Sequence, residues 1–215
     1  MRLLRDQRYA IIGKSGSGKT TTATAIACAL VPPLEQRWEI WWIDTKGDPV
    51  DRKRLATWGF GIGPKRPLKA RRLFDVQGDE REIVVQTQEI AFEACKQRHV
   101  LLVIDEYRHV VESSTKAGPG LLQVHLRGRG LHVGMIGQTQ EPAFIPRQLL
   151  SQANHLVLHS VTYPRDIERV REFDPEYPRD GRFPDRHGFR WLAIDEDESR
   201  YFTSIREWQS LTNVV

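Results

Sequence analysis

A glycine-rich segment near the start of the chain has the residue types and spacing of a phosphate-binding loop. Within AIIGKSGSGKTTTATAIA (10–27), the pattern G-x-x-x-x-G-K-[ST] is met by Gly13, Gly18, Lys19 and Thr20. Glycines allow tight turns, so that backbone N–H groups can surround a phosphate. A lysine at this spacing reaches the β- and γ-phosphates, and the threonine hydroxyl binds Mg²⁺. The segment predicts a site for ATP with Mg²⁺. The residues expected to bind the nucleotide are Gly13, Lys14, Ser15, Gly16, Ser17, Gly18, Lys19, Thr20, Thr21 and, from farther along the chain, Asp105.

Two adjacent carboxylates follow the apolar run VLLVI (100–104), which is typical of a strand buried on both faces of a parallel sheet. Asp105 and Glu106 then lie at the carboxyl end of that strand, where ligands bind in such sheets. We expect Asp105 to bind Mg²⁺ together with Thr20. Glu106 is expected to orient or deprotonate an attacking water. This second carboxylate favours hydrolysis over transfer to a small acceptor.

Apolar runs alternate with helix-like segments along the chain, which predicts an α/β fold with a mostly parallel central sheet flanked by helices. The expected strands cover residues 9–13, 38–44, 72–76, 100–106, 132–140 and 155–161. The expected helices cover residues 18–30, 79–98, a short segment ending near 129, 145–152 and 164–173. Residues 46–71, 113–120 and 174–188 are expected to be loops. FRWLAID and RYFTSI around the turn EDES predict a C-terminal β-hairpin. We expect one domain, 1–215, with its core at 8–161 and an extension at 162–215.

Composition narrows the class of protein further. The 215 residues are 40% hydrophobic and 28% charged, as in ordinary globular proteins, and carry a net charge of +4. A mildly basic chain is compatible with a nucleic-acid partner. No apolar run approaches the roughly 20 residues that span a bilayer, and the N-terminus is too charged for a signal peptide. Cys28 and Cys95 form no C-x-x-C pair. These features predict a cytoplasmic protein without stable membrane insertion.

Three further segments resemble one superfamily. WIDTKGDP (42–49) resembles the D-x-K-G-[DE] signature of the HerA–FtsK superfamily of DNA-pumping ATPases. RGRGLHVGMIGQTQEP (127–142) is similar to its G-R…T-Q-x-P segment, and NHLVLHSV (154–161) resembles the strand that follows. With the two nucleotide motifs, the resemblance covers about 10–161 in the right order. The short chain is most similar to the genome-packaging ATPases of tailless, membrane-containing viruses.

The resemblance implies a RecA-like (ASCE) P-loop NTPase fold and an ATP-driven translocase of double-stranded DNA that packages a viral genome. It also implies a ring of five or six copies in the host cytoplasm, with a capsid or membrane vertex protein as a further partner. Gln140 would sense the γ-phosphate. Arg129 would act as an arginine finger on a neighbouring subunit, with Arg127 as the alternative. Asp44 and Lys46 match the signature after the second strand, near the nucleotide or in a structural role.

A translocating ring needs basic residues toward the DNA backbone. The residues expected to contact DNA are Lys65, Arg66, Lys69, Arg71, Arg72 and Lys116. Few aromatic residues accompany them, which favours contacts with the phosphate backbone over base stacking.

The residues leave two other classes open. A small-molecule or nucleotide kinase could use the same phosphate loop, and it would need an acceptor pocket and an arginine-rich lid. A nucleotide-dependent assembly factor could bind ATP without hydrolysing it, and replacing Glu106 by glutamine would then change nothing.

Overall fold

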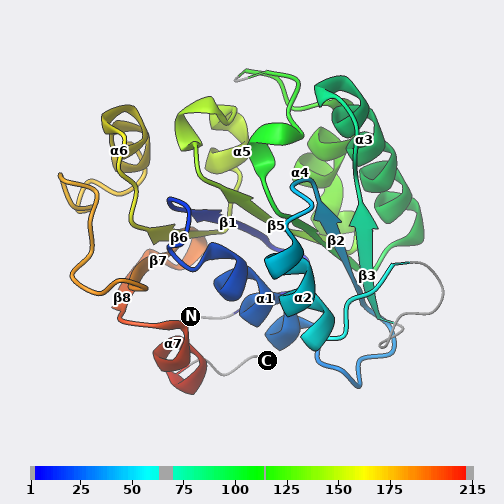
Figure 1. Cartoon of the computed structure of the whole chain (residues 1–215), viewed down its shortest axis with the longest axis horizontal. Coiled ribbons are helices and arrows are strands. Elements are labelled where there is room, and N and C mark those ends of the chain that lie inside the picture. The colour runs from blue at the N-terminus through cyan, green and yellow to red at the C-terminus, as the bar shows by residue number, and fades with distance from the viewer. Residues whose placement is uncertain (1–2, 63–69, 114, 212–215) are drawn as a thin grey trace.

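The computed structural model describes residues 3–62, 70–113 and 115–211. Its centre is an eight-stranded sheet with the order β3-β2-β4-β5-β1-β6-β7-β8 (Figure 1). The strands are β1 Arg8–Ile12, β2 Glu39–Asp44, β3 Arg71–Asp75, β4 Val100–Ile104, β5 Val133–Thr139, β6 His155–His159, β7 Phe189–Ala193 and β8 Glu198–Phe202. Strands β1 to β6 pair in parallel, whereas β7 and β8 add an antiparallel hairpin at one edge. The predicted fold class is confirmed, including the C-terminal hairpin.

Helices cover both faces of this sheet (Figure 1). They are α1 Lys19–Leu30, α2 Pro49–Thr57, α3 Glu80–Gln97, α4 Pro119–Leu131, α5 Arg147–Ser151, α6 Pro164–Arg171 and α7 Ile205–Leu211. Buried side chains of α1, α2 and α7 share one apolar cluster, and those of α3 to α6 share the other. Strand β4 shows why two clusters form: Leu101 and Val103 face the first, while Val100, Leu102 and Ile104 face the second. A strand buried on both faces explains the continuous apolar run seen in the sequence.

Two helices were not predicted. Residues 46–71 were expected to form a loop, but α2 occupies 49–57. It begins because the Asp48 side chain accepts hydrogen bonds from the N–H groups of Val50 and Asp51, and Pro49 occupies its first turn. In the C-terminal extension, the last strand ends at Phe202 and α7 follows it. Trp208 of α7 stacks on Trp191 of β7 with ring centroids 5.4 Å apart, which attaches this helix to the sheet.

The strand order determines where the site can form. Strand β5 lies between β1 and β4, with Thr139 paired to Ile12 and Gly137 paired to Ile104. The carboxyl ends of the three strands therefore lie side by side, at the edge where α/β proteins bind ligands. In the described part of the chain, no helix combines the length and apolar character needed to cross a bilayer.

Candidate nucleotide-binding site

The phosphate loop, residues 13–20, joins β1 to α1 and is anchored at both neighbouring strands. The N–H of Gly13 donates to the carbonyl of Thr139 at 3.1 Å, and that of Lys14 donates to the carbonyl of Ser160 at 2.8 Å. Gly18 has a φ of 104°, which glycine tolerates best. No side chain caps the start of α1. Its first N–H groups are thus available to an anion, such as a phosphate.

Lys19 is held inside this loop. Its side chain is 6% exposed, and its Nζ donates to the carbonyl of Lys14 at 2.9 Å. Burial and, secondly, the charge of Lys46 lower the pKa of Lys19 to about 8. The carboxylates of Asp105 and Glu106 act in the opposite direction. A lysine whose Nζ bonds to a neutral carbonyl in a buried site is well placed to bind phosphate oxygens.

Asp105 and Glu106 follow β4 at the same edge of the sheet, and each is 3% exposed. Burial raises the pKa of Asp105 to about 6, and Lys46 opposes this rise. Asp105 Oδ1 and Glu106 Oε2 have no hydrogen-bond partner among the described residues. The other oxygen of Glu106 accepts a hydrogen bond from the backbone N–H of Gln140 at 3.3 Å. The segments that follow β4 and β5, which carry the expected catalytic carboxylate and the expected γ-phosphate sensor, are therefore in direct contact.

The site suits Mg²⁺. This ion prefers oxygen ligands and usually takes one or two carboxylates together with substrate phosphates. The unpartnered oxygen of Asp105 and the hydroxyl of Thr20 provide that kind of donor. No group of three or more acidic, histidine or cysteine side chains able to hold a metal occurs in the described ranges. Mg²⁺ at this edge would take its further ligands from water and from nucleotide phosphates.

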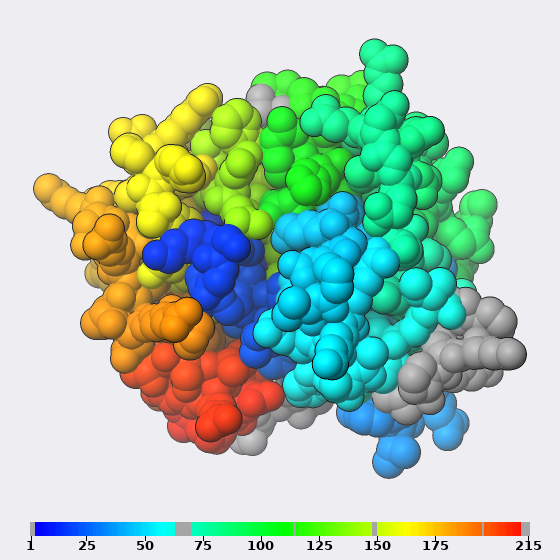
Figure 2. Space-filling view, viewed as in Figure 1, coloured from blue at the N-terminus to red at the C-terminus, as the bar shows by residue number. Residues whose placement is uncertain are grey.

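A cleft of about 750 Å³ opens over the phosphate loop, within the range of ligand pockets. In Figure 2 the blue segment, which the colour bar places within about the first 25 residues, lies between α2, in cyan, and the C-terminal segments, in orange and red. The cleft is lined by Ser15, Gly16, Gly18, Lys19, Thr20, Thr21, Thr22, Lys46, Asp48, Asp51, Arg54, Gln140, His159, His187, Ser204, Ile205 and Arg206. The structure thus brings most of the predicted nucleotide residues together with Gln140 and Lys46.

Sequence reasoning missed the contributions of α2, β6 and the C-terminal segment to this cleft. Arg54 comes from α2, and Arg206 from the start of α7. His159 of β6 lies beneath the phosphate loop, where its Nε2 is 3.2 Å from Oγ1 of Thr22. Burial and the charge of Lys19 lower the pKa of His159 to about 3, so that the ring is neutral at pH 7. No motif marks these residues, because the fold brings them together from distant segments.

The two arginines proposed as fingers lie away from this cleft. Arg127 and Arg129 are exposed near the end of α4, close to the start of β5. The phosphate loop contacts the opposite end of β5, about 20 Å away for a strand of this length. Neither arginine lines the cleft of its own chain. A role toward a neighbouring subunit stays a prediction.

The structure describes three of the six residues that were expected to bind DNA. Lys65, Arg66 and Lys69 lie outside the described residues. Arg71 is 4% exposed and donates to the carbonyl of Trp58, and Arg72 pairs with Glu39 at 2.8 Å. Arg71 is too buried to reach DNA and is not carried forward, whereas a DNA contact of Arg72, whose side chain is 34% exposed, stays a prediction. Lys116 is exposed on the loop before α4, where it pairs with Glu112 at 2.5 Å.

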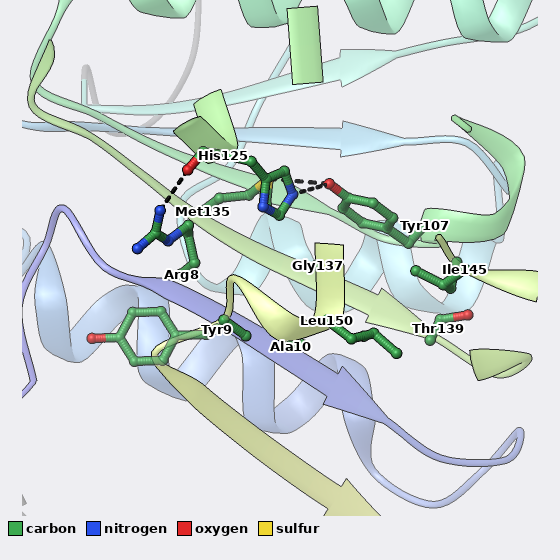
Figure 3. Close-up of a pocket in the computed structure, with 11 residues that line it drawn as sticks. Arg8, Tyr9, Ala10, Tyr107, His125, Met135, Gly137, Thr139, Ile145 and Leu150 are labelled. Carbon is green, nitrogen blue, oxygen red and sulfur yellow. Dashed lines mark hydrogen bonds between the residues drawn. The ribbon is translucent and has the colours of Figure 1, made fainter. Parts of the chain in front are cut away.

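A second, much smaller cavity lies beside the site and is lined mostly by apolar side chains (Figure 3). Its volume of about 20 Å³ has room for about one water molecule, not for a nucleotide. The hydroxyl of Tyr107 is 2.6 Å from Nε2 of His125, and the carbonyl of His125 accepts a hydrogen bond from Arg8 at 2.5 Å. Because Tyr107 follows Glu106 directly, this buried pair links the segment that carries Glu106 to α4.

No protein-family model and no curated protein matches the sequence. Solved structures match it in fold. The genome packaging NTPase B204 from Sulfolobus turreted icosahedral virus 2, in complex with sulfate, superimposes with a TM-score of 0.71 at 12% identity, over 93% of this chain and 97% of that chain. Its complex with ATP-gammaS gives 0.70 at 14%, over 94% and 98%. EssC (ATPases 2 and 3) from Geobacillus thermodenitrificans gives 0.59 at 13%, over 91% of this chain and 39% of that chain. The resemblance expected from the sequence is confirmed at the level of the fold.

Proposed function

We propose that this chain hydrolyses ATP in order to translocate double-stranded DNA, and that it packages a viral genome. One observation carries the proposal. The phosphate loop, the buried pair Asp105–Glu106 and Gln140 follow strands whose carboxyl ends lie side by side, in a sheet whose fold matches a viral genome packaging NTPase over nearly its whole length. Lys46, which lines the cleft with the phosphate loop, pairs with both carboxylates. The ATP-gammaS complex of that protein supports ATP as the ligand of this chain.

The residues suit attack of water on the γ-phosphate, which yields ADP and phosphate. The phosphate loop and Lys19 hold the phosphate oxygens and offset their charge. Glu106 lies buried at the end of β4, where it orients the water and accepts its proton. Mg²⁺, held by Thr20 and Asp105, would neutralise charge on the phosphate oxygens. The hydrogen bond from Gln140 to Glu106 gives the neighbouring strand a direct connection to the reacting group.

Coupling to DNA belongs to the assembled ring in this proposal. Arg129, or Arg127 in its place, would enter the cleft of the adjoining subunit and complete it for hydrolysis. Among the described residues, we propose that Lys116 faces DNA. Its loop begins after η1, the short helix Tyr107–His109 that follows Glu106, and ends at the start of α4, so it is close in sequence to the proposed catalytic residue. The ring of five or six copies would act in the host cytoplasm, at a vertex that carries a capsid or membrane protein.

The test is a steady-state assay of phosphate release with and without long duplex DNA, together with the mass of the assembly. A DNA-stimulated hydrolase that forms a ring supports the proposal. A phosphorylated small-molecule product would instead identify a kinase, and ATP binding without any turnover would identify a nucleotide-dependent assembly factor.

A further inference from the structure

One lysine faces both carboxylates of the site. Lys46 Nζ lies 3.5 Å from Oδ1 of Asp105 and 3.6 Å from Oε2 of Glu106. Both oxygens are buried and have no hydrogen-bond partner in the described part of the chain. Of the cationic residues that the structure describes, Lys46 is the one that pairs with them. The sequence signature around Lys46 gave it no chemical role.

The turn after β2 fixes the direction in which Lys46 extends. Asp44 Oδ1 accepts hydrogen bonds from the N–H groups of Lys46 at 3.1 Å and Gly47 at 2.8 Å. Gly47 has a φ of 65°, a conformation that favours glycine. Strands β2 and β4 are neighbours, and the N–H of Asp105 donates to the carbonyl of Ile43 at 3.1 Å. A lysine two residues beyond β2 therefore reaches across the end of β4.

The charges explain why a cation is needed there. Asp105 and Glu106 are adjacent, buried carboxylates, and burial of like charges without a counter-ion is strongly unfavourable. Lys46 supplies that counter-ion, but only loosely. Both N–O distances exceed the roughly 2.7–2.9 Å of a strong charge-assisted hydrogen bond. Its side chain is 23% exposed and borders the nucleotide cleft, so it can move away without unfolding the site.

We propose that Lys46 is an exchangeable counter-ion, which balances Asp105 and Glu106 in the empty cleft and gives up that place when the divalent cation enters with the nucleotide. Lys46 is thus a positioning residue, and it competes with the metal. The competition keeps free metal from occupying the empty cleft, so that the metal binds together with ATP. The inference rests on the proposed nucleotide site and goes beyond it by assigning a role to the strand-two lysine.

The test measures Mn²⁺ binding to the full-length, nucleotide-free protein, with free Mn²⁺ followed by electron paramagnetic resonance. Removal of the competing charge in Lys46→Met should tighten Mn²⁺ binding about tenfold, because the two ion pairs of Lys46 with Asp105 and Glu106 no longer have to be broken. Lys46→Arg keeps the charge and should bind Mn²⁺ as weakly as wild type. Lys53→Met, which removes an exposed charge from α2, should leave the affinity unchanged.

Equal or weaker Mn²⁺ binding by Lys46→Met would overturn the proposal, since a merely structural lysine predicts that result. The gain in Mn²⁺ affinity should also be lost in the double variant Lys46→Met, Asp105→Asn. If the tighter binding persists in the double variant, the metal binds elsewhere and the proposal fails. Should Lys46→Met not fold, Lys46→Gln makes the same comparison. Mn²⁺ binding requires neither turnover nor DNA. Absence of ATPase activity would therefore refute the proposed function, but the Mn²⁺-binding comparison would still test the role of Lys46.

Discussion

Acidification should remove a measurable and separable part of the protein's stability through the side chain of His125. This histidine is 3% exposed, and its Nε2 is 2.6 Å from the hydroxyl of Tyr107. Burial, with a smaller effect of the positive charge of Arg8, lowers the pKa of His125 from 6.5 to about 3. The perturbation is a shift from about pH 7.5 to about pH 5.0, across the range in which an exposed histidine becomes charged.

The sign follows from proton binding in the two states. Below about pH 6.5 the unfolded chain takes up a proton at this position, whereas the folded protein does so only near pH 3. The unfolded state therefore binds more protons between these values, and stability is lost as the pH falls. Each pH unit below 6.5 changes the free energy of unfolding by about 1.4 kcal/mol, which gives about 2 kcal/mol at pH 5.0.

Other buried groups titrate in the same range, so the measurement must isolate His125. His159 adds a loss of the same sign, because its pKa is also lowered to about 3. Asp105 acts in the opposite direction: its folded pKa is raised to about 6, so stability is gained as the pH falls below that value. The informative quantity is therefore the difference between wild type and His125→Gln at each pH.

The assay is urea unfolding at half-unit steps of pH, with the free energy of unfolding extrapolated to water. Between pH 7.5 and 5.0, wild type should lose about 2 kcal/mol more than His125→Gln. Tyr107→Phe is the matched control. It should lower stability by about 1–3 kcal/mol at every pH, since it leaves His125 Nε2 without this partner but keeps the titrating ring. Parallel curves for wild type and His125→Gln would refute the reasoning.

Two further predictions concern the packing of Tyr107 beside Glu106 and the proposed arginine finger. In Gly137→Ala, the new methyl group would lie 2.5 Å from the ring of Tyr107, and this overlap should cost about 1–3 kcal/mol in urea unfolding and reduce ATP turnover. Gly130→Ala meets nothing within 4 Å and should stabilise α4 slightly, so a comparable loss in both variants would contradict the steric argument. Arg129→Ala should abolish turnover, about 10³-fold or more, while ATP binding measured by calorimetry is unchanged. If Arg129→Ala retains turnover and Arg127→Ala loses it, the role of arginine finger belongs to Arg127 instead.

The sequence was most informative where a motif and its strand are contiguous. Gly13 to Thr20 follow an apolar strand and precede a helix, and Asp105 directly follows a strand buried on both faces, so these two parts of the site could be predicted from local patterns. Helix α2 was not predicted from the sequence, because Leu55 is its one buried residue and the helix therefore lacks an apolar periodicity. Its start signal, Asp48 followed by a proline, was the evidence available.

Contacts between distant segments could not be predicted in the same way. Lys46 reaches Asp105 because β2 pairs with β4, and His159 lies beneath the phosphate loop because β6 pairs with β1. His125 meets Tyr107 because α4 packs on this face of the sheet. Such contacts depend on strand order, which local sequence patterns do not encode.

ATP hydrolysis by wild type and Glu106→Gln, each with and without long duplex DNA, tests the central claim most directly. Wild type should release phosphate, and DNA should increase its rate several-fold. Glu106→Gln should bind ATP with similar affinity but turn it over at least about 10²-fold more slowly, since the group that accepts the proton of the water is neutral. Wild-type turnover in Glu106→Gln, or a hydrolysis rate that DNA leaves unchanged, would contradict the account.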